Sequence, residues 1–288
     1  MKKWIALLLA LVMCLALCAC GGGDPKPDGV YQADSDTYEY AAFRFADGEF
    51  ESVFVTSADE IAAGSGEYEI NTADKTIRCI YHAYRENDNF TDSKELVLSY
   101  SGSGDSLKLT ADGETFAHTD AAFREFKWVI KELVGNTEAN SRTYVYDDAG
   151  RLVDDGECQY TYNDDGTIAT STYGKNVTTY EYDSNGVLHQ KHHADGATTV
   201  MFYDDNGVLT SEAYDGVDGS YIDTGLTLYE YDDNGFLVKR EIQYFYPSKQ
   251  PTVTTYVYEN DAEGNPISFT VDGRHTSNYV YTWIEITE

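Results

Sequence analysis

The chain has 288 residues, with 50 Asp or Glu against 20 Lys or Arg, and its formal net charge is −30. A charge this negative argues against binding nucleic acid, because its backbone requires Lys and Arg to displace counterions. It also argues against electrostatic docking on anionic lipid. Hydrophobic residues make up 42% of the chain, which argues against wholesale disorder, and Tyr is unusually abundant with 25 copies.

The N-terminus has the pattern of an export signal. Two lysines precede an apolar run over residues 4–19, which is short for a membrane span and ends at small residues. The run meets a Leu-Cys-Ala-Cys sequence ending at Cys20, which resembles the lipobox of bacterial lipoproteins. The resemblance implies a signal peptide over residues 1–19, lipidation of Cys20 and anchoring to the outer face of the bacterial cell membrane. The alternative is an ordinary secretory signal with incidental cysteines.

Residues 20–28 predict a tether that begins at the lipidated cysteine, because three flexible glycines are followed by two stiffening prolines. Once the signal peptide is removed, Cys79 and Cys158 are the only cysteines besides Cys20. Two cysteines this far apart do not make a disulfide framework, although a single bridge between them stays open.

Residues 29–118 predict a small antiparallel β domain. Short alternating runs separated by Gly, Asn and Asp turns indicate seven or eight strands, in a meander that closes into a barrel or a sandwich. The expected strands include residues 38–45, 49–55, 66–70, 76–84, 96–100, 106–109 and 114–118.

The order of several short patterns in this domain resembles the lipocalin-like domains of bacterial lipoproteins. They are Gly29-x-Tyr31, Gly66-x-Tyr68-x-Ile70, Asp105-x-Leu107-x-Leu109 and a late Phe116. The resemblance implies a barrel whose mouth takes a small apolar ligand. The alternative, which we favour, is a barrel filled by its own side chains, as small barrels usually are.

Residues 119–141 predict a connecting helix followed by a short polar link. Apolar side chains recur at spacings of three, four and three, which is one face of a helix: Phe123, Phe126, Ile130 and Leu133. Asp120 is a suitable cap for its start and Gly135 for its end. We expect this stripe to pack on one of the two β domains, with a partner-binding helix as the alternative.

Residues 142–288 carry an internal repeat of the form Tyr-x-Tyr-acid-x-x-Gly-x-Leu. Its second tyrosine is Tyr146, Tyr162, Tyr182, Tyr203, Tyr231 and Tyr258, and a half copy ends with Tyr281. The copy at Tyr258 reaches its glycine, Gly264, only after two extra residues. Self-similarity at this spacing indicates an array in which each unit buries its apolar face against its neighbours.

The spacing within the unit predicts a hairpin. Asp147 to Gly150 fits a type I turn followed by a left-handed residue, in which Asp accepts bonds from backbone N–H groups and Gly takes the positive φ. With that turn, Tyr146 lies opposite Leu152 and on the same face as Tyr144. Each hairpin therefore has one Tyr/Tyr/Leu face.

These units resemble the YD-repeat family, the Tyr-Asp repeats of RHS-type surface proteins and toxins. The Tyr-Asp pair recurs at 146–147, 182–183, 203–204 and 231–232, each followed by Gly and Leu at the family's spacing. The resemblance implies β-hairpins strung into a long, coiled antiparallel sheet on an extracellular protein, and it implies carbohydrate binding by the repeat.

Tyrosine rings suit sugar binding because they combine a flat apolar face with a polar tip. The repeat tyrosines are in phase with Leu, so we favour their being the buried face of the sheet. The tyrosines outside the repeat pattern are the better ligand candidates: Tyr173, Tyr214, Tyr221, Tyr244 and Tyr246.

Metal sites and catalysis find little support. The Asp-Asp-Asn-Gly turns lack the spacing of a calcium loop, so turn chemistry is the better account of them, with calcium binding as the alternative. His189 and His193 would share a strand face but lie too far apart for a simple pair of zinc ligands. No nucleophile elbow, zinc-protease, phosphate-loop or dinucleotide motif occurs. We therefore expect no metal, no cofactor and no enzymatic activity.

Three hypotheses follow for this all-β, two-domain chain. The first is a surface protein that binds extracellular carbohydrate through its repeats. The second is a structural or assembly lipoprotein that pairs with an envelope protein through sheet edges or the apolar face of the repeats. The third is a carrier that holds a small apolar ligand in its first domain.

Overall fold

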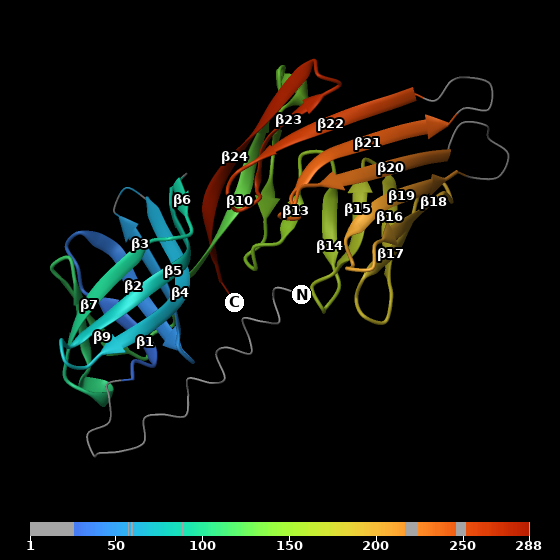
Figure 1. Cartoon of the computed structure of the whole chain (residues 1–288). Helices are drawn as coiled ribbons and strands as arrows, with labels where there is room; N and C mark the ends of the chain where they lie inside the picture. Colours follow the sequence, from blue (N-terminus) through green and yellow to red (C-terminus); the bar gives the residue numbers. More distant parts are fainter. Residues whose placement is uncertain are drawn as a thin grey trace. The chain divides into compact units, whose positions relative to one another are not determined.

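The computed structural model describes residues 26–56, 58, 60–87, 89–216, 224–245 and 252–287. The expected signal peptide with Cys20, and the candidate ligand residues Tyr221 and Tyr246, lie outside the described residues. The chain is all-β, which confirms the predicted class, and it divides into two compact units (Figure 1). In the described ranges, no helix has both the length and the apolar character needed to cross a membrane.

Among the described residues, the first unit comprises those from 26 to 84 together with those from 92 to 123. Its strands are β1 (Gly29–Ala33), β2 (Tyr38–Ala46), β3 (Glu49–Thr56), β4 (Ile61–Asn71), β5 (Thr76–Glu86), β7 (Glu95–Ser101), β8 (Lys108–Ala111) and β9 (Glu114–Thr119). They pair in the order β4-β3-β2-β1-β9-β8-β7-β5, and a further pairing of β4 with β5 closes the barrel. The short strand β6 (Asn89–Thr91) extends the sheet beside β5. Barrel closure of this kind leaves few open edges.

The barrel interior is packed with its own side chains. Large aromatic residues dominate it, with Phe43, Phe50 and Phe116 all at most 1% exposed. The ring centroids of Phe43 and Phe116 lie 4.9 Å apart in an edge-on arrangement, which is a favourable geometry for aromatic pairs. The interior thus agrees with the filled barrel that the sequence favours.

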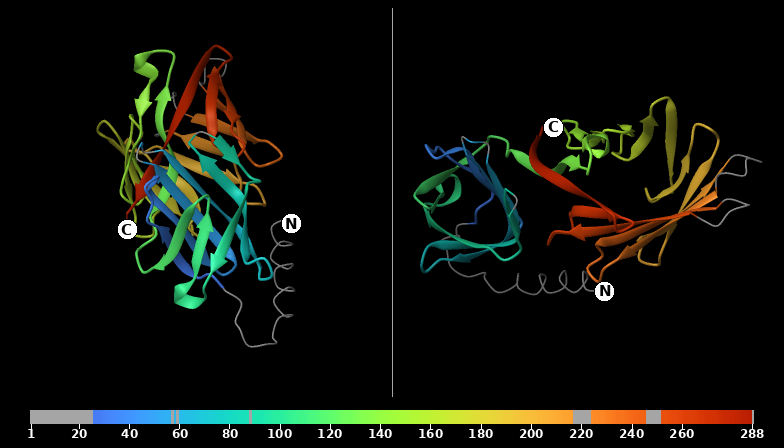
Figure 2. Two further views of the ribbon diagram at one scale, coloured as in Figure 1. Left: turned by 90° about the vertical axis from the view of Figure 1, so that its left-hand side faces the viewer. Right: turned by 90° about the horizontal axis from the view of Figure 1, so that it is seen from above.

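The second unit comprises residues 85–91 and 124–288 and contains a 15-stranded antiparallel sheet. Its strands are β10 (Glu125–Val134), β11 (Arg142–Thr143), β12 (Val145–Tyr146), β13 (Leu152–Asp154), β14 (Gln159–Tyr162), β15 (Ile168–Tyr173), β16 (Asn176–Tyr182), β17 (Leu188–His192), β18 (Thr198–Tyr203), β19 (Leu209–Asp215), β20 (Thr224–Tyr231), β21 (Leu237–Phe245), β22 (Thr252–Asn260), β23 (Pro266–Val271) and β24 (His275–Ile286). Consecutive hairpins build most of it, and the sheet curves strongly within this unit (Figure 2).

This sheet nearly closes on itself. Strands β11 and β12 lie at its two opposite ends in pairing order, although only Tyr144 separates them in the sequence. The backbone N–H of Tyr144 donates to the carbonyl oxygen of Lys131 at 2.9 Å, and the Tyr146 hydroxyl donates to that of Ile130 at 2.8 Å. Both contacts attach the first hairpin to β10, so the ends of the sheet are fastened together.

The expected helix within residues 119–141 is wrong, because residues 125–134 form β10. This strand pairs along its length with β24, and a bulge interrupts the pairing between Ile130 and Glu132. A bulge shifts the side-chain alternation by one residue. The apolar positions on either side of it are therefore out of phase, which imitates the spacing of a helix. The run Trp128-Val129-Ile130 has the aromatic and β-branched composition of a strand.

The repeat turns have the geometry that the spacing predicts. In the third copy of the repeat, the N–H of Gly186 donates to the carbonyl oxygen of Asp183 at 3.1 Å, and Gly186 has φ +77°. Asp183 Oδ1 accepts from the N–H groups of Asn185 and Val187 at 2.8 and 2.9 Å. A register shift directly before Tyr182 places it opposite Leu188. The turn chemistry thus explains why the unit needs Asp and Gly at these positions.

In the sixth copy of the repeat, the turn lies two residues later than the sequence pattern predicts. Its turn runs from Asp261 to Gly264, with the Gly264 N–H donating to the Asp261 carbonyl oxygen at 3.0 Å. Asn260 therefore holds the second tyrosine position, and it pairs with Pro266 in place of Leu. If Tyr258 is taken as the first tyrosine of this repeat copy, its spacing matches that of the other copies and no extra residues are needed.

Candidate functional site

One face of the repeat sheet carries the paired tyrosines, and we call it the tyrosine face. The repeat tyrosines are half-buried, whereas the residues between them are exposed: Val145 is 50% exposed, Phe202 48% and Val257 48%. The tyrosine face is therefore the sheltered side of the curved sheet.

The tyrosine hydroxyls form a ladder of hydrogen bonds along this face. The second tyrosine of a unit donates to a backbone carbonyl oxygen at the start of the returning strand of the preceding hairpin, as Tyr203 does to Leu188 at 2.6 Å. Equivalent bonds join Tyr182 to Ile168, Tyr231 to Leu209 and Tyr281 to Pro266. Buried tyrosine hydroxyls need such partners. Most repeat tyrosines are thus committed to the architecture of the sheet.

Two of the candidate ligand residues, Tyr214 and Tyr244, lie on the tyrosine face on either side of a glycine. Tyr214 of β19 pairs with Gly225 of β20, and Gly225 pairs with Tyr244 of β21. The three residues form one row across three strands. On β20 this row lies four residues before the repeat tyrosine Tyr229, an even number, so both rows are on the same face of the sheet. Their side chains consequently share the face of the repeat tyrosines.

Gly225 has no side chain of its own between Tyr214 and Tyr244, and the space there has room for a methyl group. A Cβ atom at this position would meet Tyr214 Cβ at 3.7 Å and Tyr244 Cδ1 at 3.8 Å, both ordinary contact distances. Glycine in a strand interior weakens the strand and often marks a place where something approaches the backbone closely. We call this row the tyrosine cradle.

A cavity of about 370 Å³ opens at the cradle. Eight residues line it: Thr199, Glu212, Tyr214, Gly225, Leu226, Thr227, Ile242 and Tyr244. Ligand sites typically combine an apolar lining with a few polar groups that fix orientation, and this lining has that composition.

The polar groups of the cradle are held in place by their neighbours. Glu212 is largely buried and pairs with Lys191, whose Nζ lies 3.2 Å from Glu212 Oε1. Thr199 Oγ1 lies 2.8 Å from His193 Nε2, and the His193 ring is 5.4 Å from that of Tyr214. Burial lowers the pKa of His193, so its neutral form is favoured. The site therefore offers a carboxylate, two threonine hydroxyls and the rings and hydroxyls of two tyrosines.

The remaining sequence candidates do not join this site. Tyr173 is 62% exposed beside the turn at Gly174 and is not among the residues lining the cavity. His189 lies 3.8 Å from Glu181, and no group of three or more metal-ligating side chains occurs in the part of the chain that the structure describes.

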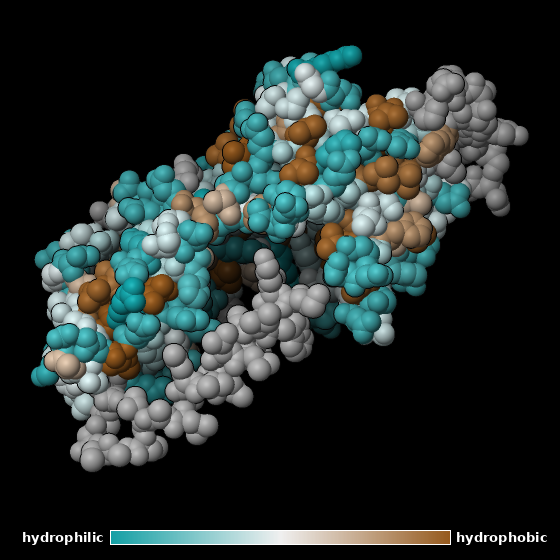
Figure 3. Space-filling view, viewed as in Figure 1, coloured by the Kyte–Doolittle hydropathy of each residue, from teal (hydrophilic) through white to brown (hydrophobic). Residues whose placement is uncertain are grey.

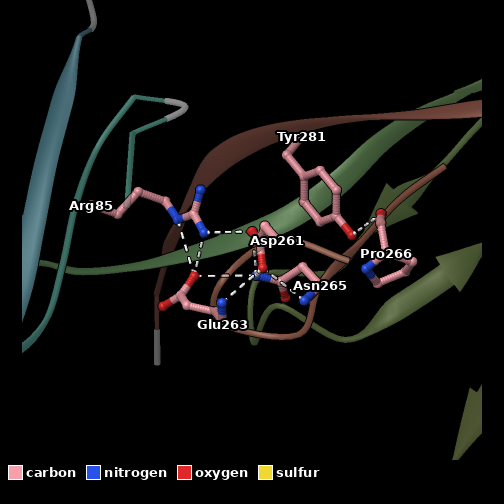
Figure 4. A network of polar contacts seen from close by, with 6 residues as sticks. All are labelled: Arg85, Asp261, Glu263, Asn265, Pro266 and Tyr281. Atoms are coloured by element: carbon pink, nitrogen blue, oxygen red, sulfur yellow. Dashed lines mark hydrogen bonds and ion pairs between the residues drawn. The ribbon is translucent and has the colours of Figure 1, made fainter. Parts of the chain in front are cut away.

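A second buried polar cluster has a structural role. Arg85, which belongs to the second unit, donates to Asp261 at 2.9 Å and to Glu263 at 3.2 Å, and its side chain is 6% exposed (Figure 4). Its guanidinium also stacks over the Trp128 ring, 4.8 Å from the centroid. Two carboxylates and an aromatic face saturate this cation, so it holds the sixth turn in place.

Sequence reasoning identifies Tyr214 and Tyr244 as ligand candidates but misses the residues between and around them. The available signal for Gly225 is an isolated glycine inside a strand pattern. Glu212 and Thr227 have no such signal, because their position on the tyrosine face depends on the pairing of β19, β20 and β21.

Comparisons with known proteins give distant likenesses. No family model and no curated protein matches the chain. A porin-like protein from Bacteroides uniformis ATCC 8492 is similar over 82% of this chain and 97% of its own, at 11% identity and a TM-score of 0.26. A TcdB2-TccC3-TEV crystal structure matches 94% of this chain, which corresponds to 19% of that chain, at 12% identity and a TM-score of 0.21. Likenesses this distant carry no argument about function.

Proposed function

We propose that the protein is a non-enzymatic, lipid-anchored surface protein that binds extracellular carbohydrate in the tyrosine cradle. The observation that carries the proposal is the Tyr214–Gly225–Tyr244 row with the cavity above it. A sugar has apolar C–H faces and polar hydroxyls, so it fits a site that combines aromatic rings with hydrogen-bonding groups.

Each part of the cradle has a place in this proposal. Tyr244 is 44% exposed, so its ring is open to a ligand, and Gly225 carries no side chain that would compete with a sugar for the space beside that ring. Glu212 and Thr227 supply an acceptor carboxylate and a hydroxyl to the same cavity. A volume of about 370 Å³ lies within the usual range for small-molecule sites.

A direct test is binding of the full chain to an oligosaccharide array, with variants that fill or strip the cradle. Gly225→Val places a side chain between the rings, and Tyr244→Ala removes one of them; both are expected to lose at least tenfold in affinity. Tyr173→Ala is the matched control, because Tyr173 is an exposed tyrosine outside the cavity. Wild-type protein that binds no oligosaccharide would refute the proposal.

Lipid anchoring is a separate part of the proposal and rests on the sequence that ends at Cys20. Metabolic labelling of the host cell with palmitate is expected to mark the wild-type protein and not Cys20→Ala. Equal labelling of the two would contradict anchoring while leaving carbohydrate binding untouched.

The other two hypotheses have less support. The packed aromatic interior of the barrel favours a structural role for the first unit over that of a carrier. Assembly through sheet edges is disfavoured because the repeat sheet ends in β11 and β12, which are two residues each. On the surface seen in Figure 3, apolar side chains are interspersed with hydrophilic ones, and a partner-binding patch would be broader.

A further inference from the structure

Arg240 lies on the tyrosine face next to the cradle. It belongs to β21 and pairs with Tyr229 of β20 and with Tyr256 of β22. Its guanidinium stacks over the Tyr256 ring, 4.2 Å from the centroid. Ile242, which lines the cavity, is the next residue on the same face of β21, so the two positions are separated by about 7 Å.

This arginine has no acidic partner among the described residues. Arg240 Nε is buried and has no hydrogen-bond acceptor there, and none of the described carboxylates forms an ion pair with it. The chain has 50 acidic residues for 20 Lys and Arg, so an unpaired arginine in a sheltered position is unusual. By contrast, Arg85 contacts two carboxylates and Lys191 contacts one.

An unpaired buried N–H group is costly because it has lost its hydrogen bonds to water. Within the same face, the negative charge of Glu212 is already balanced by Lys191. The aromatic surroundings of Arg240 also exclude water, which strengthens its attraction for an anion. A ligand that brings a negative group to the outer guanidinium nitrogens of Arg240 would therefore meet a cation that has no acidic partner among the described residues.

We infer that Arg240 binds the carboxylate of an acidic sugar whose neighbouring ring occupies the tyrosine cradle. The inference deepens the proposed function and rests on it. A planar guanidinium matches a carboxylate through two parallel hydrogen bonds, and stacking on Tyr256 fixes its plane. With a net charge of −30, the protein repels densely charged polyanions, so sparse carboxylates suit it better than a highly sulfated or nucleic-acid chain.

Calorimetric titration of the full chain tests the inference. Two oligosaccharides of equal length are compared, of which one is neutral and the other carries a uronic acid. Wild-type protein is expected to prefer the acidic oligosaccharide at least tenfold. Arg240→Gln is expected to remove the preference and leave affinity for the neutral one within twofold. Arg240→Lys keeps the positive charge but lacks the planar guanidinium group, and it is expected to retain part of the preference for the acidic oligosaccharide.

The matched control is Arg274→Gln, which makes the same charge change at an exposed turn. It is expected to keep the wild-type preference, which excludes a general effect of net charge. Equal wild-type affinity for the two oligosaccharides, or a preference that survives in Arg240→Gln, would overturn the inference while leaving the proposed function standing. If neither oligosaccharide nor any on the array binds, the proposed function fails and the inference fails with it.

Discussion

Asn260 Nδ2 donates a hydrogen bond of 2.9 Å to the carbonyl oxygen of Leu237. Asn260 occupies the position that a tyrosine holds in the other units, and there the tyrosine hydroxyl makes the equivalent bond to the preceding hairpin. The shared property of this position is therefore hydrogen-bond donation across the sheet. The aromatic ring is one way of reaching the carbonyl, and a shorter amide is another.

Removing one hydroxyl from this ladder should weaken the repeat sheet. Tyr203→Phe leaves the carbonyl oxygen of Leu188 without its donor, and we expect a loss of about 1 kcal/mol in the free energy of unfolding. Urea denaturation followed by circular dichroism measures the change. Tyr173→Phe is the control, because this exposed tyrosine lies outside the ladder. Equal stability of the two variants would contradict a structural role for the hydroxyl.

The hairpin turns and the tyrosine face could be predicted because they depend on neighbours in the sequence. Asp183 and Gly186 have side-chain and backbone preferences that fit one turn, and the position of Tyr182 follows from it. The bulge in β10 could not be predicted, because it is defined by pairing with β24, which lies about 150 residues later. Because of this distant pairing, residues whose apolar spacing is typical of a helix form a strand.

The candidate site could be predicted only in part for the same reason. Tyr214 and Tyr244 stand out because they lie outside the repeat pattern. Their approach to each other depends on Gly225 being in register with both. Arg240 becomes notable only when Glu212, on the same face, is known to pair with Lys191. Strand pairing, which sequence spacing does not specify at this range, determines all of these relationships.

The buried Arg85 should contribute far more to stability than an exposed arginine. Arg85→Ala leaves Asp261 and Glu263 without their cation, and breaking a buried ion pair typically costs about 3 kcal/mol. Arg124→Ala is the control, because the Arg124–Glu285 pair is more exposed and should contribute about 0.5 kcal/mol. Urea denaturation of both variants measures the difference, and a similar small loss in each would show that burial of Arg85 adds nothing.

The repeat turns should make stability sensitive to acid. Backbone N–H groups of Val187 and Asn185 hold the pKa of Asp183 below its ordinary value of 3.8, and those of Val208 and Asn206 lower that of Asp204. A lowered folded-state pKa gives stabilisation that is present above the ordinary value and is lost as the pH falls through the folded-state value. We therefore expect the melting temperature to fall between about pH 5 and pH 3.

The double variant Asp183→Asn/Asp204→Asn tests this origin of the acid sensitivity. Asn keeps a side-chain oxygen for the turn but does not titrate in this range. The melting temperature of the double variant should therefore change less between about pH 5 and about pH 3 than that of the wild type. Identical pH profiles would assign the sensitivity to other carboxylates.

The two described cysteines should differ in reactivity. Burial raises the pKa of Cys79 to about 12, and its side chain is fully buried in the barrel core. Cys158 is partly exposed, and burial with nearby acidic groups raises its pKa as well. Because the thiolate is the reactive form and needs access, iodoacetamide should label Cys158 slowly and Cys79 only after unfolding. Mass spectrometry of tryptic peptides measures both rates, and faster labelling of Cys79 in the folded protein would contradict its burial.

Closure of the barrel depends on a glycine in β4. A Cβ atom at Gly66 would lie 2.0 Å from the carbonyl oxygen of Ile80, a backbone atom of the adjacent strand β5 that has no alternative position. Gly66→Ala should therefore separate β4 from β5 and prevent a cooperatively folded barrel, as seen by loss of protected amides in hydrogen exchange. Gly48→Ala is the control, because its new methyl group meets no atom within 4 Å and only its positive φ of 92° opposes the change. The control should lose about 1 kcal/mol and keep its protected amides, whereas a barrel that tolerates both substitutions equally would show that this pairing does not close it.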